Sequence, residues 1–89
     1  MNKSEIQQKI DSIINEILSR DPGLNFNEMS IADKMNIIIS ESSQALEFVT
    51  TVEDEFDIEL DDDDIDLDFF IDINTMIERL NVNITNKSQ

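Results

Sequence analysis

The chain has 89 residues, a formal net charge of -15 at pH 7 with 21 acidic and six basic residues, and neither cysteine nor histidine. A chain of this size holds one small core, so we expect a single domain over residues 1–89, with its core in about residues 4–80 and a frayed tail at 81–89. The missing residue types exclude cysteine or histidine nucleophilic centres and histidine-based zinc sites, so we expect a protein that is not an enzyme, without catalytic residues or a metal site.

The first predicted element is an amphipathic helix that begins near Ser4, a candidate N-cap. Apolar residues recur behind it at helical spacing; they are Ile6, Ile10, Ile13, Ile14, Ile17 and Leu18. Pro22 and Gly23 then favour a break. From Leu24 to Ser40 the apolar residues show no sustained period, so we expect a long ordered loop with one short helical turn near Ile31–Met35.

A second amphipathic helix is predicted after the serines and the glutamate at residues 40–43, which offer N-cap oxygens and negative charge to a first turn. From Ala45 the apolar residues recur at spacings of four, three and four. The stripe consists of Ala45, Val49, Val52 and Phe56, widened by Leu46 and Phe48. The helix should begin close to Ser42, whose hydroxyl would then lie at a helix N-terminus, where unpaired N–H groups favour a phosphoester.

Residues 38–56 resemble the signature of acyl and peptidyl carrier proteins, in which an Asp-Ser-Leu triplet opens the second helix and its serine carries 4'-phosphopantetheine. The segments Glu47-Phe48-Val49 and Glu53-Asp54-Glu55-Phe56 match the family's Glu-Leu-Val and Glu-Glu-Glu-Phe. In this alignment the modified serine is Ser42, and Ser43 is the neighbouring alternative. Glu41 stands where aspartate is usual, and Ser43 where leucine is usual.

The similarity covers about residues 6–80, including the loop at residues 56–60 and the last helix at residues 74–80. Together with the helical stripes it implies an all-α fold, a small four-helix bundle of the acyl carrier protein type. We expect three longer helices and one short helix, with a long loop between helices one and two.

The net charge is concentrated around the candidate serine. No lysine or arginine occurs from Met35 to Glu78, whereas fifteen acidic residues do. Such a field disfavours nucleic acid and anionic lipid and attracts basic protein surfaces, although it could also be a solvated face that serves solubility. By the resemblance, basic surfaces of cognate enzymes would contact the outward side of the second helix. The candidate partner-binding residues are Glu41, Glu47, Thr50, Glu53 and Asp54.

Three shorter segments follow the second helix. The sequence Asp57-Ile58-Glu59-Leu60 is too short to pair as a strand, so we expect an extended turn that tucks Ile58 and Leu60 inward. Asp64 could cap a short helix from about Ile65 to Phe70; its partly buried residues would be Ile65, Leu67, Phe69 and Phe70. A final helix begins at Asp72 or Asn74, with Arg79 near its end. Its inner stripe is Ile71, Ile73, Met76, Ile77 and Leu80.

The acidic run at residues 61–68 does not match a calcium-binding EF-hand. A loop that starts at Asp62 has Leu67 where the motif needs glycine and Ile73 where it needs a bidentate glutamate. Weak binding of divalent ions by clustered carboxylates remains as an alternative reading, in which the protein would be an acidic ion-binding module.

The resemblance implies a stand-alone acyl or aminoacyl carrier protein. A phosphopantetheinyl transferase would use coenzyme A and magnesium to make Ser42 a phosphoester, and the thiol of the arm would hold a substrate as a thioester. Loading and processing enzymes of fatty acid, polyketide or nonribosomal peptide biosynthesis would then act on it. We expect a cytoplasmic monomer without membrane insertion, since Ile37–Ile39 is the longest aliphatic run. The alternative is a non-acylated acidic interaction or regulatory protein of the same fold.

Overall fold

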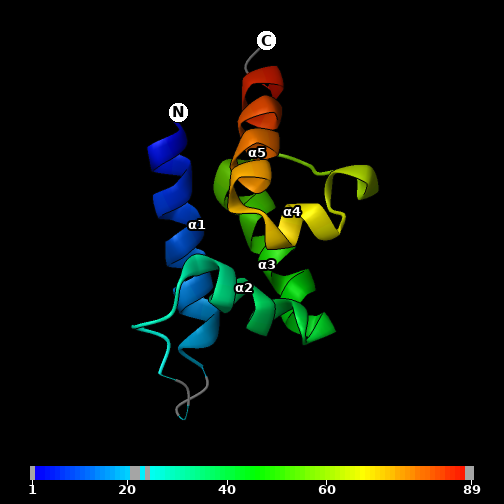
Figure 1. Ribbon diagram of the computed structural model, residues 1–89. Coiled ribbons are helices and arrows are strands. Elements are labelled where there is room, and N and C mark those ends of the chain that lie inside the picture. Colours follow the sequence, from blue (N-terminus) through cyan, green and yellow to red (C-terminus); the bar gives the residue numbers. More distant parts are fainter. Residues whose placement is uncertain (1, 21–22, 24, 88–89) are drawn as a thin grey trace.

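The computed structural model describes residues 2–20, 23 and 25–87 (Figure 1). Its helices are α1 (Lys3–Leu18), α2 (Ile31–Ile39), α3 (Ser42–Phe56), α4 (Leu67–Ile71) and α5 (Ile73–Lys87), with a 3-10 turn η1 (Asp62–Asp64) before α4. The described residues contain no strand, which confirms the predicted all-α bundle. α1 packs against α3 and α5, while α2 contacts α1, α3 and α4 (Figure 1).

One apolar core holds the helices together. All six residues of the predicted α1 stripe are buried, with exposures between 0% and 6%. Phe48 of α3 and Phe69 of α4 are both fully buried and are the largest side chains in that state. Burying a side chain of this size stabilises the fold by roughly 1.5–3 kcal/mol. Packing of these apolar faces therefore provides the main drive for the arrangement of the helices.

The start of α1 differs from the prediction by two residues. Asn2, not Ser4, is the N-cap, because its side-chain oxygen accepts the backbone N–H of Glu5 at 2.8 Å. The predicted break at Pro22 and the predicted start of the loop at Leu24 lie outside the described residues.

The loop predicted over residues 24–40 contains more helix than expected. In place of a single turn at residues 31–35, α2 runs for nine residues and is capped by Ser30, whose hydroxyl oxygen accepts the N–H of Asp33 at 3.1 Å. Met35 and Ile38 are 1% and 0% exposed and join the core. Three consecutive isoleucines at residues 37–39 obscure the helical spacing of the buried residues, because the sequence does not show which of the three faces the core.

α3 begins at Ser42, as predicted, and ends at Phe56. Val49, Val52 and Phe56 are buried, and Ala45 is half-buried. Leu46, however, is 69% exposed and does not widen the stripe. It lies two residues before the fully buried Phe48. Two residues correspond to a rotation of about 200° around the helix axis, so these two side chains point to opposite sides of α3.

The chain leaves α3 through a left-handed residue. Asp57 has φ 53°, and the N–H of Ile58 donates to the carbonyl of Glu53 at 3.0 Å, which is the bonding pattern of a Schellman motif. Ile58 is 8% exposed and Leu60 is partly buried against the core. The predicted extended turn that tucks both side chains inward is confirmed.

α4 starts later than predicted. Asp66, not Asp64, caps it by accepting the N–H of Phe69 at 3.1 Å, whereas Asp64 belongs to η1 and accepts the N–H of Asp61 at 3.4 Å. Phe69 enters the core, and Leu67 is 64% exposed instead of partly buried. In a helix of five residues only one face can contact the core, and in α4 this face is occupied by Phe69.

Asp72 accepts the N–H groups of Asn74 and Thr75 at 3.0 and 3.4 Å, so the predicted start of the last helix is confirmed. Two expectations are wrong. Ile71 is 46% exposed and so is not part of the inner stripe. α5 continues to Lys87, so Arg79 is in mid-helix and not near the end; residues 81–87, which were expected to belong to a frayed tail, are helical, and residues 88–89 lie outside the described residues. No helix in the described part of the chain is long and apolar enough to cross a membrane.

Candidate functional site

Ser42 is the first residue of α3, and its side chain is exposed, as is that of Ser43. The link from α2 is two residues long and is tied back to that helix. The hydroxyl of Ser40 donates to the carbonyl of Ile37 at 2.6 Å, and the N–H of Glu41 donates to the carbonyl of Ile38 at 3.2 Å. The C-terminal turn of α2 therefore positions the start of α3.

The N-terminus of α3 lacks the side-chain cap that other helices of the bundle have. Asn2, Ser30 and Asp66 cap α1, α2 and α4. Glu41 occupies the N-cap of α3, but its side chain makes no cap hydrogen bond, and the first turn contains no acidic residue. The sequence had predicted capping oxygens and a negative first turn here, and both expectations are wrong.

An uncapped first turn retains unpaired N–H groups and the positive end of the helix dipole. The positive end would stabilise a negatively charged phosphoester on the neighbouring hydroxyl. The exposed Ser42 hydroxyl lies at this uncapped helix end, directly after the exposed Glu41 at the N-cap.

The five candidate partner-binding residues have different surroundings. Glu41, Thr50 and Asp54 are exposed, and the Thr50 hydroxyl donates to the carbonyl of Leu46 at 3.0 Å. Glu47 and Glu53 are half-buried and engaged within the chain. The exposed Leu46 adds an apolar side chain to this side of α3, about one turn beyond Ser42.

Glu47 and Glu53 each have an internal partner that the sequence did not reveal. The carboxylate of Glu47 contacts the guanidinium of Arg20, which follows the end of α1. Glu53 accepts the backbone N–H of Leu60 at 2.9 Å. The sequence predicted only that Arg20 lies near the end of a helix. It could not predict the pair with Glu47, because a local pattern does not connect two residues that are 27 positions apart.

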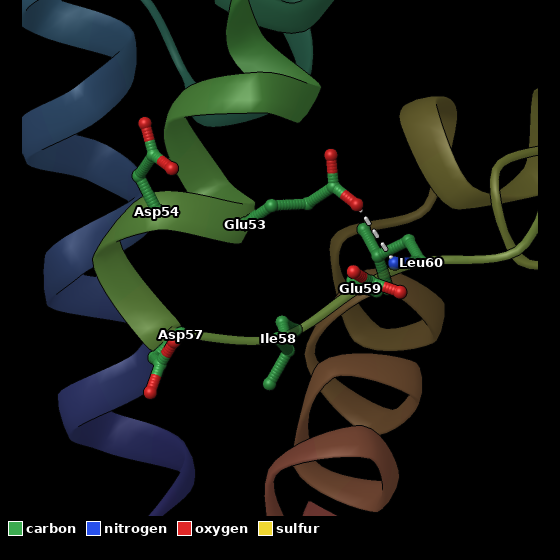
Figure 2. Close-up of a pocket in the computed structure, with 6 residues that line it drawn as sticks. All are labelled: Glu53, Asp54, Asp57, Ile58, Glu59 and Leu60. Carbon is green, nitrogen blue, oxygen red and sulfur yellow. Dashed lines mark hydrogen bonds between the residues drawn. The ribbon is translucent and has the colours of Figure 1, made fainter.

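A surface pocket of about 680 Å³ lies at the other end of α3 (Figure 2). Its lining residues are Glu53, Asp54, Asp57, Ile58, Glu59 and Leu60. Figure 2 shows the side chain of Glu53 reaching from α3 to the backbone of Leu60. Four of the six lining side chains are carboxylates, whereas pockets for apolar ligands are lined mainly by apolar groups. This pocket therefore does not fit an apolar ligand.

The acidic segment after α3 is anchored by one arginine. Arg79 of α5 donates to the carboxylate of Asp66 at 2.7 Å and to the backbone carbonyl of Asp64 at 2.9 Å. The hydrogen bond from Arg79, aided by the N–H of Phe69, lowers the pKa of Asp66 below its ordinary value. The same contact raises the pKa of Arg79. Among the described residues, no three acidic side chains converge so as to hold a metal ion.

The chain is similar in sequence to a known carrier protein. The acyl carrier protein of Thermosynechococcus vestitus is 34% identical to the chain over 64 residues, which are 72% of this chain and 75% of that protein. No protein-family model matches the chain, and no solved structure matches it.

Proposed function

The chain belongs to the acyl carrier protein family, and on this premise we propose that Ser42 carries 4'-phosphopantetheine and that the protein presents acyl or aminoacyl groups to enzymes. The observation that carries the proposal is the position of Ser42: exposed, first in α3, and beside an uncapped helix N-terminus. Ser43 is exposed as well and is the off-by-one alternative. Within one cytoplasmic carrier domain, the chain supplies position and recognition and does not itself make bonds.

Attachment requires a phosphopantetheinyl transferase and coenzyme A. The Ser42 hydroxyl would lose its proton, bond to the phosphorus that bears pantetheine, and release adenosine 3',5'-bisphosphate as the leaving group. Once bound, the group supplies a thiol that forms thioesters. The residues of the chain keep the serine exposed, and the α3 N-terminus stabilises the negative phosphoester.

The proposed partners are the transferase and acyl- or aminoacyl-loading and processing enzymes with basic surfaces. Glu41 at the N-cap of α3, and Thr50 and Asp54 within that helix, are exposed, so an enzyme can contact them directly on the monomeric carrier. Glu47 and Glu53 are also proposed as contacts, but each must first leave its internal partner. The acidic surface would speed encounter with basic enzymes, and the rate would fall as salt rises.

The test is the intact mass of the protein after incubation with coenzyme A, magnesium and a broad-specificity phosphopantetheinyl transferase. We expect the gain of one phosphopantetheine group in the native chain and in Ser43→Ala, and none in Ser42→Ala. Loss of the gain only in Ser43→Ala would move the site by one residue. No gain in the native, folded chain would refute attachment and favour the non-acylated interaction protein of the same fold.

A further inference from the structure

Two ion pairs join α3 to α1 and to the residues directly after α1, one toward each end of α3. Lys9 lies 2.7 Å from the carboxylate of Glu55, and Arg20 contacts the carboxylate of Glu47. Both pairs are partly exposed, with side-chain exposures of 40% and 44% for the first and 57% and 38% for the second. Each is a contact between a basic side chain and a glutamate of α3, and they differ in how far they lie from Ser42.

The Arg20–Glu47 pair is the one close to the candidate attachment site. Glu47 follows Ser42 by five residues, or about 7.5 Å along the helix axis, whereas Glu55 follows it by thirteen residues, or about 20 Å. At physiological ionic strength the Debye length is about 8 Å, so a change of charge at Glu47 is felt at Ser42 and one at Glu55 is largely screened. The local field at the site therefore depends on Arg20 and not on Lys9.

We propose that Arg20 determines partner specificity by occupying the carboxylate of Glu47. A basic group of an enzyme can bind Glu47 only by displacing Arg20, and until then the pair presents almost no net charge. Partners that depend on Glu47 are thereby disfavoured relative to those that contact Glu41 and Asp54, which are exposed. This inference rests on the proposed function and adds to it the control of partner choice at the same site.

The chain positions Arg20 for this role through α1. Its backbone N–H donates to the carbonyl of Ile17 at 3.4 Å, and Ile17 is 3% exposed, so Arg20 is bonded to a residue of α1 that is fixed in the core. The planar guanidinium also matches a carboxylate better than an ammonium does. Because exposed ion pairs contribute little, the expected competition is modest, about two- to fivefold in apparent affinity.

The experiment measures phosphopantetheine transfer from coenzyme A by the same broad-specificity transferase at 0.15 M NaCl. The Michaelis constant for the carrier is compared between the native chain, Arg20→Gln, Arg20→Lys and Lys9→Gln. Arg20→Gln and Lys9→Gln change the net charge equally, and each breaks one ion pair with a glutamate of α3. We expect Arg20→Gln to lower KM about two- to fivefold with unchanged kcat, Arg20→Lys to lower it by less, and Lys9→Gln to keep the native KM.

Equal KM values for Arg20→Gln and Lys9→Gln would overturn the assignment, because net charge alone would then explain any effect. A fall in KM for Arg20→Lys as large as that for Arg20→Gln would overturn it as well, since the charge next to Glu47 is retained there. Either result leaves the proposed function intact if the native chain gains its mass. Absence of the mass gain in the native chain would instead refute the proposed function, and this inference with it.

Discussion

The buried lysine of α2 allows a prediction in which removing an exposed partner costs more than removing the buried charge itself. Lys34 is 7% exposed. Its ammonium lies 2.9 Å from the side-chain oxygen of Asn15 and 3.3 Å from the carboxylate of Asp11. It is also 5.8 Å from the centre of the Phe26 ring, within range of a cation–π contact. These contacts join α1, α2 and the loop between them.

Asp11→Ala should destabilise the fold by about 1.5–3 kcal/mol, the net contribution of a hydrogen bond to a charged group, because the ammonium is too buried to regain water. Lys34→Met should cost less than about 1 kcal/mol. Methionine preserves most of the apolar stem, and the side chain of Asp11 is already 40% exposed and can be hydrated. The double variant should be more stable than Asp11→Ala alone, since it contains no buried ammonium that lacks a carboxylate partner.

Urea unfolding followed by circular dichroism at 0.15 M NaCl gives the free energies. Asp11→Ala reduces the excess negative charge and Lys34→Met increases it, so general charge repulsion acts against the predicted order. The reasoning would be refuted if Lys34→Met were the more damaging single change, because the ion pair would then stabilise the fold by more than it costs to bury.

Three further predictions concern α3 and the segment after it. Phe56→Ala should lower the free energy of unfolding by about 3–5 kcal/mol, because this side chain is 5% exposed; a loss below about 1 kcal/mol in urea unfolding would contradict its place in the core. Glu53→Ala should raise the amide exchange rate of Leu60 about tenfold, since the carboxylate accepts that N–H, and an unchanged rate would argue against the bond. The pKa of Asp66 is lowered in the folded state, so its contact with Arg79 stabilises the fold above about pH 4 and is lost as the pH falls through the folded pKa. The difference in Tm between the native chain and Arg79→Gln should therefore be larger at pH 6 than at pH 3, and an equal difference at both would contradict this account.

Local patterns in the sequence predicted the parts of the fold that depend on one helix at a time. The stripes of α1 and of the second half of α3 are buried as expected, because a spacing of three and four residues places side chains on one face whatever the helix packs against. The start of α5 was predictable as Asp72 or Asn74 for a similar reason, since a cap involves only the residues that follow it, and the structure selects Asp72.

The same local patterns gave wrong predictions where a short segment is compatible with two structures. α2 was read as a loop because its apolar residues include the run at 37–39, and only packing against α1 and α3 selects Met35 and Ile38 as its inner residues. Leu46 was assigned to the buried stripe of α3, but it is exposed because Phe48, on the opposite side of the helix, faces the core. At the α3 N-terminus several oxygens could serve as the cap, and Ser40 instead bonds to the preceding helix.

The sequence by itself determined the all-α class, the buried faces of α1 and of most of α3, the acidic character of the surface and the location of Ser42 at a helix start, because each depends on residue type and on spacing within a few positions. Only the tertiary structure decided which charges are available. The pairs Lys9–Glu55, Arg20–Glu47 and Lys34–Asp11 join residues 46, 27 and 23 positions apart. Contacts of this kind exist only after the helices have packed, so no local pattern in the chain could have predicted that Glu47 already has a partner.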